Sequence, residues 1–328
     1  MPNFFQKVLH PEWYHGHGKR PPFFEGWYFK LIDATEKYRF AVIPGIFLSD
    51  DPEKRHAFVQ VLDGQTGGSA YFTYPTEQFF AADDQFDIRV GPNSFGADCM
   101  TLNLEGDALA LKGELKFSGR APWPVTLTAP GIMGWYGWVT FMECYHGVVS
   151  LDHIINGSLM LDGKTLDYNG GRGYIEKDWG QSFPSAWVWM QTNHFGYPGT
   201  CLTASIAVIP MLGRKFPGHI IGVWHDKTLY KFAKYTGAKI EKLAVTDEHV
   251  TWVVSDQHHR LEIFATRSGG GLLHAPSRTE MHKRVMETLQ STVEICLSHR
   301  EGSNPEIFHG TGRNAGLEVQ GDLGMLLK

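Results

Sequence analysis

The segment from residue 173 to residue 193 places ionisable side chains directly before a tract with three tryptophans. Its sequence is GYIEKDWGQSFPSAWVWMQTN, in which Glu176 and Asp178 immediately precede Trp179. Carboxyl groups held among aromatic rings have shifted pKa values, which suits them to acid–base chemistry. The alternative is a strand whose carboxylates simply face water. The segment therefore marks Glu176 and Asp178 as the first candidates for chemistry.

A second cluster lies upstream, in MECYHGVVSLDHIING at residues 142–157. It brings Glu143, His146, Asp152 and His153 into a mostly apolar stretch. Buried carboxylates and imidazoles are costly unless they are paired, so this density of ionisable groups indicates a functional site. Mutual hydrogen bonding that only stabilises the fold is the alternative, and both interpretations stay open at this point.

Two more segments carry candidate site residues. In PPFFEGWYFKL, residues 21–31, Glu25 is enclosed by aromatic neighbours that include Trp27 and Tyr28. In the second segment, 186–193, a strand would place two large rings and two amides on one face. Such a face suits a pocket that binds an apolar body and orients a polar end. The residues on that face are Trp187, Trp189, Gln191 and Asn193.

Motifs for other kinds of chemistry are missing from the sequence. There is no GxSxG elbow, no Walker-type loop and no GxGxxG motif between a strand and a helix. Of the sixteen histidines, the two closely spaced pairs, His15 with His17 and His258 with His259, lack a companion ligand at local spacing. We therefore predict no metal site and no cofactor.

Composition narrows the class of protein further. The 328 residues are 42% hydrophobic and 20% charged, as in a folded protein, and the net charge of −5 without a basic stretch argues against nucleic-acid binding. The first twenty residues lack the apolar run of a signal peptide, and no run approaches the roughly 20 residues that cross a bilayer. The four cysteines form no CxxC motif. We expect a cytoplasmic protein with reduced, buried thiols, for which any membrane contact is peripheral.

The elements that must position these residues are strands, because the dominant hydrophobic period is two. Short β-branched or aromatic runs end at Gly, Pro, Asp or Asn, and Asp-Gly pairs at 63–64 and 162–163 predict hairpins. Residues 279–297 show both helical spacing and alternation, and we favour a strand there. The pattern predicts an all-β chain of sandwiches or barrels in two units, with no flexible linker between them.

These clusters together resemble the tocopherol cyclase family. The matching elements are FFEGWYFK, CYHGVVSLDHIING, YIEKDWGQSFPSAWVWMQTN and the closing GTGRNAGLEVQG, which occur in the family's order. The resemblance implies two packed, lipocalin-like antiparallel β-barrels, which we place at residues 1–178 and 179–328. It also implies an enzyme that closes a chroman ring on a prenylated hydroquinone or a related prenyl lipid, without a cofactor.

That chemistry assigns roles to the candidate residues. The alkene must be protonated by a carboxylic acid, for which the resemblance favours Glu176 or Asp178, while Asp152 and His153 orient the donor or take the phenol proton. Aromatic faces stabilise the developing cation. The substrate-binding residues that we predict are Glu25, Trp27, Tyr28, Glu143, His146, Tyr174, Trp179, Trp187, Trp189, Gln191 and Asn193.

Two other classes of function remain open. A hydratase or isomerase of an isoprenoid would use the same acid with a different second step. A non-catalytic carrier of a lipophilic ligand would need the aromatic cavity but no protonated carboxyl inside it. A third interpretation is that the charged motifs only stabilise the fold. In each functional case the partner is a small lipophilic molecule, and the sequence does not predict an oligomeric state.

Overall fold

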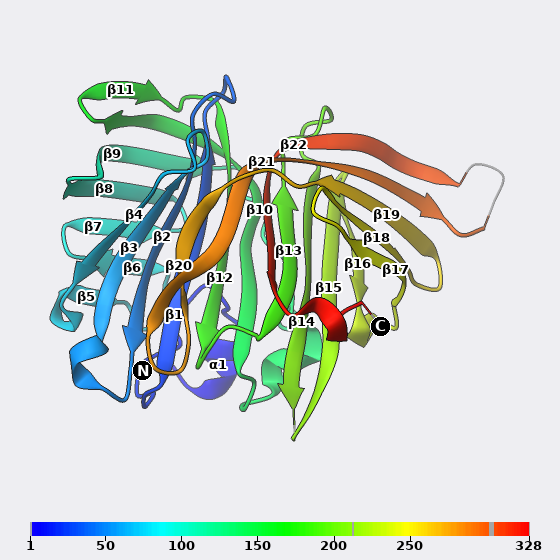
Figure 1. Ribbon diagram of the computed structural model, residues 1–328, viewed down its shortest axis with the longest axis horizontal. Helices are drawn as coiled ribbons and strands as arrows, with labels where there is room; N and C mark the ends of the chain where they lie inside the picture. The colour runs from blue at the N-terminus through cyan, green and yellow to red at the C-terminus, as the bar shows by residue number, and fades with distance from the viewer. Residues whose placement is uncertain (1, 212, 302–304, 328) are drawn as a thin grey trace. The chain divides into compact units, whose positions relative to one another are not determined.

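The protein consists almost entirely of antiparallel strands (Figure 1). The structure is a computed structural model that describes residues 2–211, 213–301 and 305–327. Within these ranges the α-helix content is one short element, α1 (Phe4–Val8). None of the helices formed by these residues is long and apolar enough to cross a membrane. The prediction of an all-β chain is confirmed.

The first sheet has twelve strands in the order β4-β3-β2-β1-β12-β10-β9-β8-β7-β6-β5, with β11 paired to β10. Strand β12, which carries Glu176 and Asp178, lies between β1 and β10 in this sheet. The strands are β1 (Phe23–Ile32), β2 (Arg39–Leu48), β3 (His56–Asp63), β4 (Ser69–Tyr74), β5 (Phe79–Ala81), β6 (Asp87–Val90), β7 (Asn93–Gly96), β8 (Cys99–Gly106), β9 (Leu109–Ser118), β10 (Cys144–Leu161), β11 (Lys164–Asp167) and β12 (Gly171–Gly180).

The second sheet has ten strands in the order β16-β15-β14-β13-β22-β21-β19-β18-β17, with β20 paired to β21. Its strands are β13 (Ala186–Thr192), β14 (Cys201–Met211), β15 (Arg214–His225), β16 (Thr228–Ala233), β17 (Lys239–Val245), β18 (His249–Ser255), β19 (His259–Thr266), β20 (Gly271–Pro276), β21 (Met281–His299) and β22 (Glu306–Gly321).

The chain forms two compact units that differ from simple halves. The first unit contains residues 1–183 and also 271–285, and the second contains 184–270 and 286–328. The first unit thus extends past residue 178, and it also includes a later segment that the sequence placed in the second domain. Each unit has its own apolar core, as two lipocalin-like barrels require.

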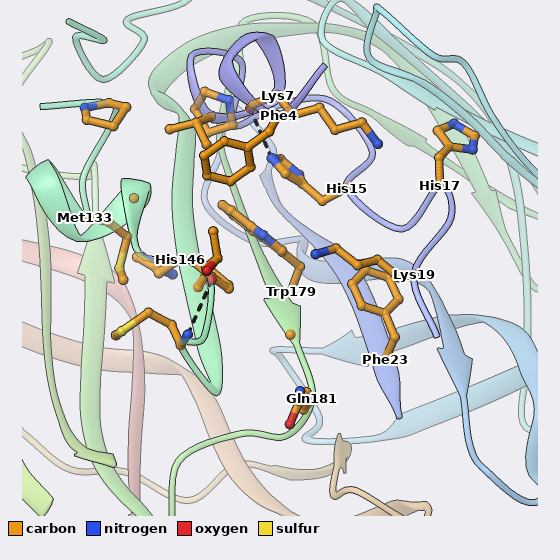
Figure 2. Close-up of a pocket in the computed structure, with 18 of the residues that line it drawn as sticks. Phe4, Lys7, His15, His17, Lys19, Phe23, Met133, His146, Trp179 and Gln181 are labelled. Carbon is orange, nitrogen blue, oxygen red and sulfur yellow. Dashed lines mark hydrogen bonds between the residues drawn. The ribbon is translucent and has the colours of Figure 1, made fainter. Parts of the chain in front are cut away.

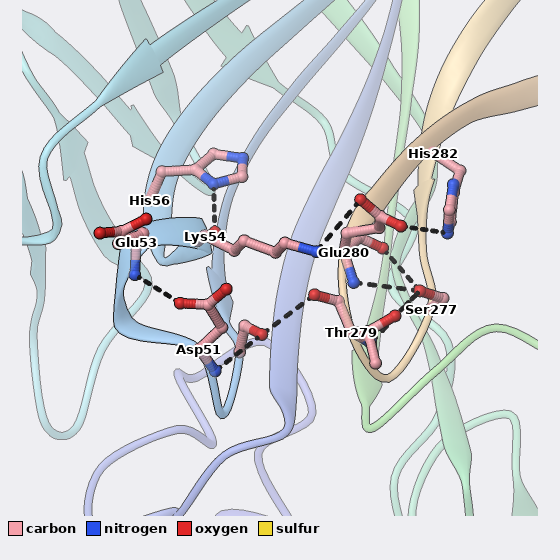
Figure 3. Close-up of polar contacts among 9 residues, drawn as sticks. Asp51, Glu53, Lys54, His56, Ser277, Thr279, Glu280 and His282 are labelled. Carbon is pink, nitrogen blue, oxygen red and sulfur yellow. Dashed lines mark hydrogen bonds and ion pairs between the residues drawn. The ribbon is translucent and has the colours of Figure 1, made fainter.

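The returning segment is tied to the first unit by polar contacts near the start of β3 (Figure 3). The Lys54 ammonium lies 3.4 Å from a carboxylate oxygen of Glu280, and the Ser49 hydroxyl donates to the Thr279 carbonyl at 3.0 Å. In the turn before β21, the Ser277 hydroxyl donates to the Glu280 carbonyl at 2.8 Å. Contacts far apart in sequence therefore hold residues 271–285 on the first sheet.

Burial follows the predicted alternation. In β21, Val293, Ile295 and Leu297 are buried while Glu294 is exposed, which confirms a strand in the ambiguous segment 279–297. A two-residue turn joins β10 to β11, and both of its residues, Asp162 and Gly163, have positive φ as a tight hairpin requires. The hairpin predicted at 63–64 also forms, with a longer loop from residue 64 to residue 68.

The four cysteines are all free. Cys201 is buried, as we expected of these thiols. Cys99 is exposed, because it begins β8 with its side chain on the outer face of the alternating pattern. Cys144 and Cys296 are partly buried. The prediction that all four thiols are buried is therefore confirmed for Cys201 alone and is wrong for Cys99.

Candidate active site

Strand β12 presents different chemistry on its two faces. Ile175 belongs to the apolar core of the first unit and Trp179 packs against that core. Because successive side chains of a strand point to opposite faces, Tyr174, Glu176 and Asp178 lie on the other face. Glu176 is only about 5% exposed, so the simple interpretation of a carboxylate facing water does not hold for it.

His146 of strand β10 lies between the two carboxylates of β12. The register pairs His146 with Asp178 across the strands. The His146 Nδ1–H donates to Asp178 Oδ1 at 2.9 Å, and His146 Nε2 lies 3.6 Å from Glu176 Oε2. The Tyr174 hydroxyl donates to the same Glu176 oxygen at 2.5 Å. We call these four residues, Tyr174, Glu176, Asp178 and His146, the acid cluster.

The acid cluster holds a proton strongly. Burial alone lowers the pKa of His146, but the charges of Asp178 and Glu176 and the hydrogen bond to Asp178 outweigh it and raise the pKa to about 9. At neutral pH the ring is therefore an imidazolium between two carboxylates. The His146 ring therefore keeps a proton next to Glu176 over the whole physiological pH range.

The cluster also has ligand types that bind metal ions. One ligand atom each from His146, Glu176 and Asp178 lies within 4.8 Å of the others. However, the two carboxylates approach different nitrogens of the ring, Nδ1 and Nε2, whereas a metal ion takes one nitrogen of a histidine. The arrangement fits a shared proton better than a shared cation.

The structure does not place Asp152 and His153 in the acid cluster. The Asp152 carboxylate forms two hydrogen bonds with Arg172, at 3.1 and 2.7 Å. His153 is buried against the Phe117 ring at 4.7 Å and its Nδ1 lies 3.1 Å from the Ser150 hydroxyl. Burial, together with nearby arginines, lowers the pKa of His153 to about 3, so it is neutral at physiological pH.

A second ionisable network lies on the inner face of the same strands. Lys177 and Glu25, both with fully buried side chains, form an ion pair between Nζ and Oε1. The Lys177 ammonium also donates to the Trp13 carbonyl at 2.5 Å and lies 3.1 Å from His15 Nδ1. It contacts the rings of Trp27 and Trp179, each 4.7 Å from Nζ. Trp27, which the sequence placed next to Glu25, thus contacts the lysine that pairs with Glu25.

The charges of this inner network compensate each other. Burial raises the pKa of Glu25, but Lys177 and His15 outweigh it and keep that pKa below its ordinary value. Burial lowers the pKa of Lys177, and Glu25 offsets only part of this effect. The sequence analysis did not identify Lys177 and His15 as site residues. The available signal was Glu25 itself, because a carboxylate in an apolar strand requires a cationic partner.

A cavity of about 350 Å³ borders both networks, and His146 is the one member of the acid cluster among the described residues that line it. His146 of the acid cluster and His15 and Trp179 of the inner network all line it. The His15 ring stacks on Trp179 with centroids 4.3 Å apart (Figure 2). The Tyr145 ring also stacks on Trp179, with centroids 5.3 Å apart. Apolar side chains complete much of the wall, among them Phe4, Phe23, Pro130, Met133 and Met142.

The other predicted binding residues lie in several places. Tyr28 pairs with Glu176 across β1 and β12, so it shares the face of the acid cluster. Glu143 lies 3.2 Å from Arg278 and is not part of the cavity wall. Trp27 is fully buried in the first core. Every residue that lines the cavity belongs to the first unit.

Strand β13 belongs to the second unit, with the two faces that the sequence predicted. Val188 and Met190 are part of the second core. Trp187, Trp189 and Gln191 therefore lie on the opposite face of the strand and do not line the interior of their own barrel. The Trp187 Nε1–H donates to Glu318 at 2.6 Å, the Gln191 amide lies 3.7 Å from the Cys201 sulfur, and Asn193 Oδ1 is 2.9 Å from His194 Nδ1.

Comparison with known proteins identifies related sequences. The sequence model described as tocopherol cyclase-like matches residues 118–321. A probable chloroplastic tocopherol cyclase of Oryza sativa subsp. japonica is 24% identical over 371 residues, which cover 94% of this chain and 77% of the rice protein. The chloroplastic tocopherol cyclase of Zea mays is 26% identical over 201 residues, which cover 57% of this chain and 41% of the maize protein.

A solved structure shares the fold. The crystal structure of CghA with Sch210972 superposes with a TM-score of 0.57 at 12% sequence identity, and the match covers 93% of this chain and 90% of that chain. The crystal structure of CghA without that compound gives a TM-score of 0.55. At this identity the likeness concerns the fold alone, and it bears out the prediction of two lipocalin-like antiparallel barrels.

Proposed function

This chain belongs to the tocopherol cyclase-like family, and on that premise we propose that it catalyses an acid-initiated ring closure on a prenylated hydroquinone or a related prenyl lipid. The observation that carries the proposal is the position of His146. It is held between Asp178 and Glu176, retains its proton at neutral pH, and lines a largely apolar cavity next to Trp179. This is the combination that protonation of an alkene requires.

The first step is delivery of the stored proton. Asp178 fixes the imidazolium through Nδ1, so the other N–H of His146 faces Glu176. Transfer of that proton converts Glu176 into a carboxylic acid and leaves a neutral imidazole. A neutral carboxylic acid is a stronger acid than an imidazolium, which makes Glu176 the better donor to a carbon atom. The Tyr174 hydroxyl holds the carboxyl group in place during the transfer.

The remaining steps balance without any other reactant. His146 is the member of the acid cluster that lines the cavity, so the alkene must reach past it to Glu176, which is not among the described residues of the wall. Glu176 then gives its proton to the less substituted alkene carbon, which forms a C–H bond and leaves tertiary cation character on the neighbouring carbon. The phenol oxygen attacks that carbon and forms the C–O bond. The phenol proton leaves and returns to the acid cluster, where it restores the imidazolium of His146. The product is an isomer of the substrate.

The cavity supplies the physical conditions for these steps. The face of an aromatic ring stabilises a desolvated cation by about 2 kcal/mol, and Trp179 and Tyr145 offer stacked rings at the wall. Holding the phenol against the alkene removes much of the entropic barrier. A volume of about 350 Å³ is at the lower end of small-molecule sites, which suits an aromatic head and the reacting prenyl unit rather than a whole lipid tail.

The test is incubation of the purified protein with a prenylated hydroquinone, followed by mass analysis of the product. We expect an isomer of unchanged elemental composition. A product heavier by one water would indicate a hydratase instead. Recovery of bound, unchanged ligand from a panel of prenylated hydroquinones would contradict the proposed enzyme and favour a carrier.

A matched pair of variants connects the activity to the cluster. Glu176→Gln keeps the shape of the side chain but removes the acid, so we expect loss of turnover with retained binding. Glu143→Gln is the same change in the same unit, at a carboxylate that lies 3.2 Å from Arg278, whereas Glu176 lies 3.6 Å from His146. Turnover that survives Glu176→Gln unchanged would exclude Glu176 as the donor.

A further inference from the structure

Large apolar side chains are exposed around the cavity, on α1 and on the segment from residue 121 to residue 142. Phe5 is 66% exposed, Leu127 72% and Phe141 59%. Single exposed apolar residues are normal on protein surfaces, but a contiguous group marks an interaction site. We call this group, together with the partly buried Trp138, the aromatic patch, which consists of Phe4, Phe5, Leu127, Trp135, Trp138 and Phe141.

Ring contacts show that the two segments form one surface. The Trp138 ring lies 6.1 Å from the Phe4 ring and 5.7 Å from the Phe5 ring, between centroids. The Trp138 Nε1–H donates to the Leu127 carbonyl at 2.9 Å, which joins the two ends of the second segment. Phe4 and the neighbours Met133 and Thr140 also line the cavity, so the patch is continuous with the cavity mouth.

The charges around the patch are mostly basic. Residues 121–142 contain no charged side chain, and residues 2–24 contain a single acidic residue, Glu12, which pairs with His10 at 3.0 Å. In contrast, the cavity wall includes Lys7, Lys19 and Arg20, and none of the described residues that line it is an Asp or a Glu (Figure 2). Asp83 is an acidic residue at this rim, 3.2 Å from His17, and its charge also acts on Lys7. This segregation stands out in a chain whose net charge is −5.

We propose that the aromatic patch docks the protein onto an anionic lipid bilayer, with the cavity mouth at the membrane surface. Phe and Trp side chains partition into the interfacial region of a bilayer, and neighbouring Lys and Arg side chains are attracted to anionic head groups. A lipophilic substrate then enters the cavity without crossing water. Substrate delivery rests on the proposed function, whereas docking itself does not.

A second copy of the chain is a poorer occupant of this surface. A two-fold symmetric contact places the same surface on both partners, so the basic rim with Lys7, Lys19 and Arg20 would lie against a second surface that carries the same basic residues. Like charges brought together at an interface are repulsive. An anionic lipid surface provides the complementary charge that a second copy lacks.

The experiment is flotation of the full chain with vesicles of phosphatidylglycerol and phosphatidylcholine in equal amounts, and with phosphatidylcholine alone. We expect binding to the anionic vesicles that weakens in high salt, by about fivefold for each basic side chain that becomes screened. The triple change Phe5→Ser, Trp135→Ser and Phe141→Ser should weaken binding on the order of a hundredfold, about fivefold for each half-inserted side chain. These three residues do not line the cavity.

The matched control removes three exposed apolar side chains elsewhere, Ile154→Ser, Met160→Ser and Phe264→Ser, and should bind as the unmodified protein does. Failure of the unmodified protein to bind anionic vesicles in low salt would overturn the proposal, as would full binding by the patch variant. The protein could instead be a dimer that does not bind vesicles and that dissociates when the three patch residues are changed. That result would identify a second copy as the occupant and would also overturn the proposal. Because no substrate is present, none of these outcomes depends on the proposed reaction.

Discussion

Replacing Asp178 by Asn should shift the pH range over which the enzyme works. The asparagine keeps the size of the side chain and can still accept the hydrogen bond from His146 Nδ1, but it removes the negative charge next to the ring. Because Asp178 is the main group that raises the pKa of His146, the acid cluster should lose its proton at a lower pH in this variant.

The magnitude follows from the pKa of His146. An increase from 6.5 to about 9 corresponds to about 3 kcal/mol in favour of the imidazolium. If the pKa returns to its ordinary value, only about 3% of the ring is protonated at pH 8, so kcat/KM there should fall about thirtyfold. At pH 5.5 most of the ring is protonated in both proteins, and their activities should be similar.

The assay is the pH profile of kcat/KM, with the titration of the His146 ring followed by NMR as a measurement that needs no substrate. We expect the alkaline limb near pH 9 in the unmodified protein and a limb displaced toward neutral pH in Asp178→Asn. If the alkaline limb and the ring titration stay where they are in the variant, the reasoning about the acid cluster is wrong.

Three more predictions concern the same strands. Glu176→Gln should lower turnover at least a hundredfold at every pH, without the recovery at low pH expected for Asp178→Asn, while Glu143→Gln leaves turnover unchanged in the same assay. Lys177→Met leaves the buried Glu25 carboxylate unpaired and should lower the free energy of unfolding by about 3–5 kcal/mol in urea titrations; the added change Glu25→Gln should recover much of this, and no recovery would contradict the ion-pair explanation. The free energy of unfolding should also depend on pH through His146, because the pKa of this ring is raised in the folded protein. Its contribution of about 3 kcal/mol is complete below pH 6.5 and is lost as the pH rises through about 9. The His146→Phe variant should lack this pH dependence.

Much of the fold followed from the sequence because period-two alternation has a direct physical cause. A strand with one face in a core must alternate, and in β21 the buried Val293 and Ile295 on either side of Glu294 decided between strand and helix. The return of residues 271–285 to the first unit could not be predicted in this way. It depends on contacts such as Lys54 with Glu280, which are remote in sequence and carry no local pattern.

The site was predictable in its residue types but less so in its pairs. Alternation placed Glu176 and Asp178 on the face opposite Lys177, and the density of ionisable groups singled out His146, which lies 2.9 Å from Asp178. The pairs of residues that meet across β10 and β12 could not be predicted, because the register between these strands shifts between Ser150 and His153. A register shift of this kind leaves no trace in the hydrophobic pattern, so Asp152 looked equivalent to the carboxylates of the acid cluster.

The most direct test of the account is turnover of a prenylated hydroquinone in D₂O, with the position of deuterium in the product determined by NMR. Proton delivery from the acid cluster predicts one deuterium, bonded to the carbon that was the less substituted end of the alkene, and no such product from Glu176→Gln. A cyclised product without deuterium on that carbon, or equal incorporation by Glu176→Gln, would contradict the assignment of Glu176 as the proton donor.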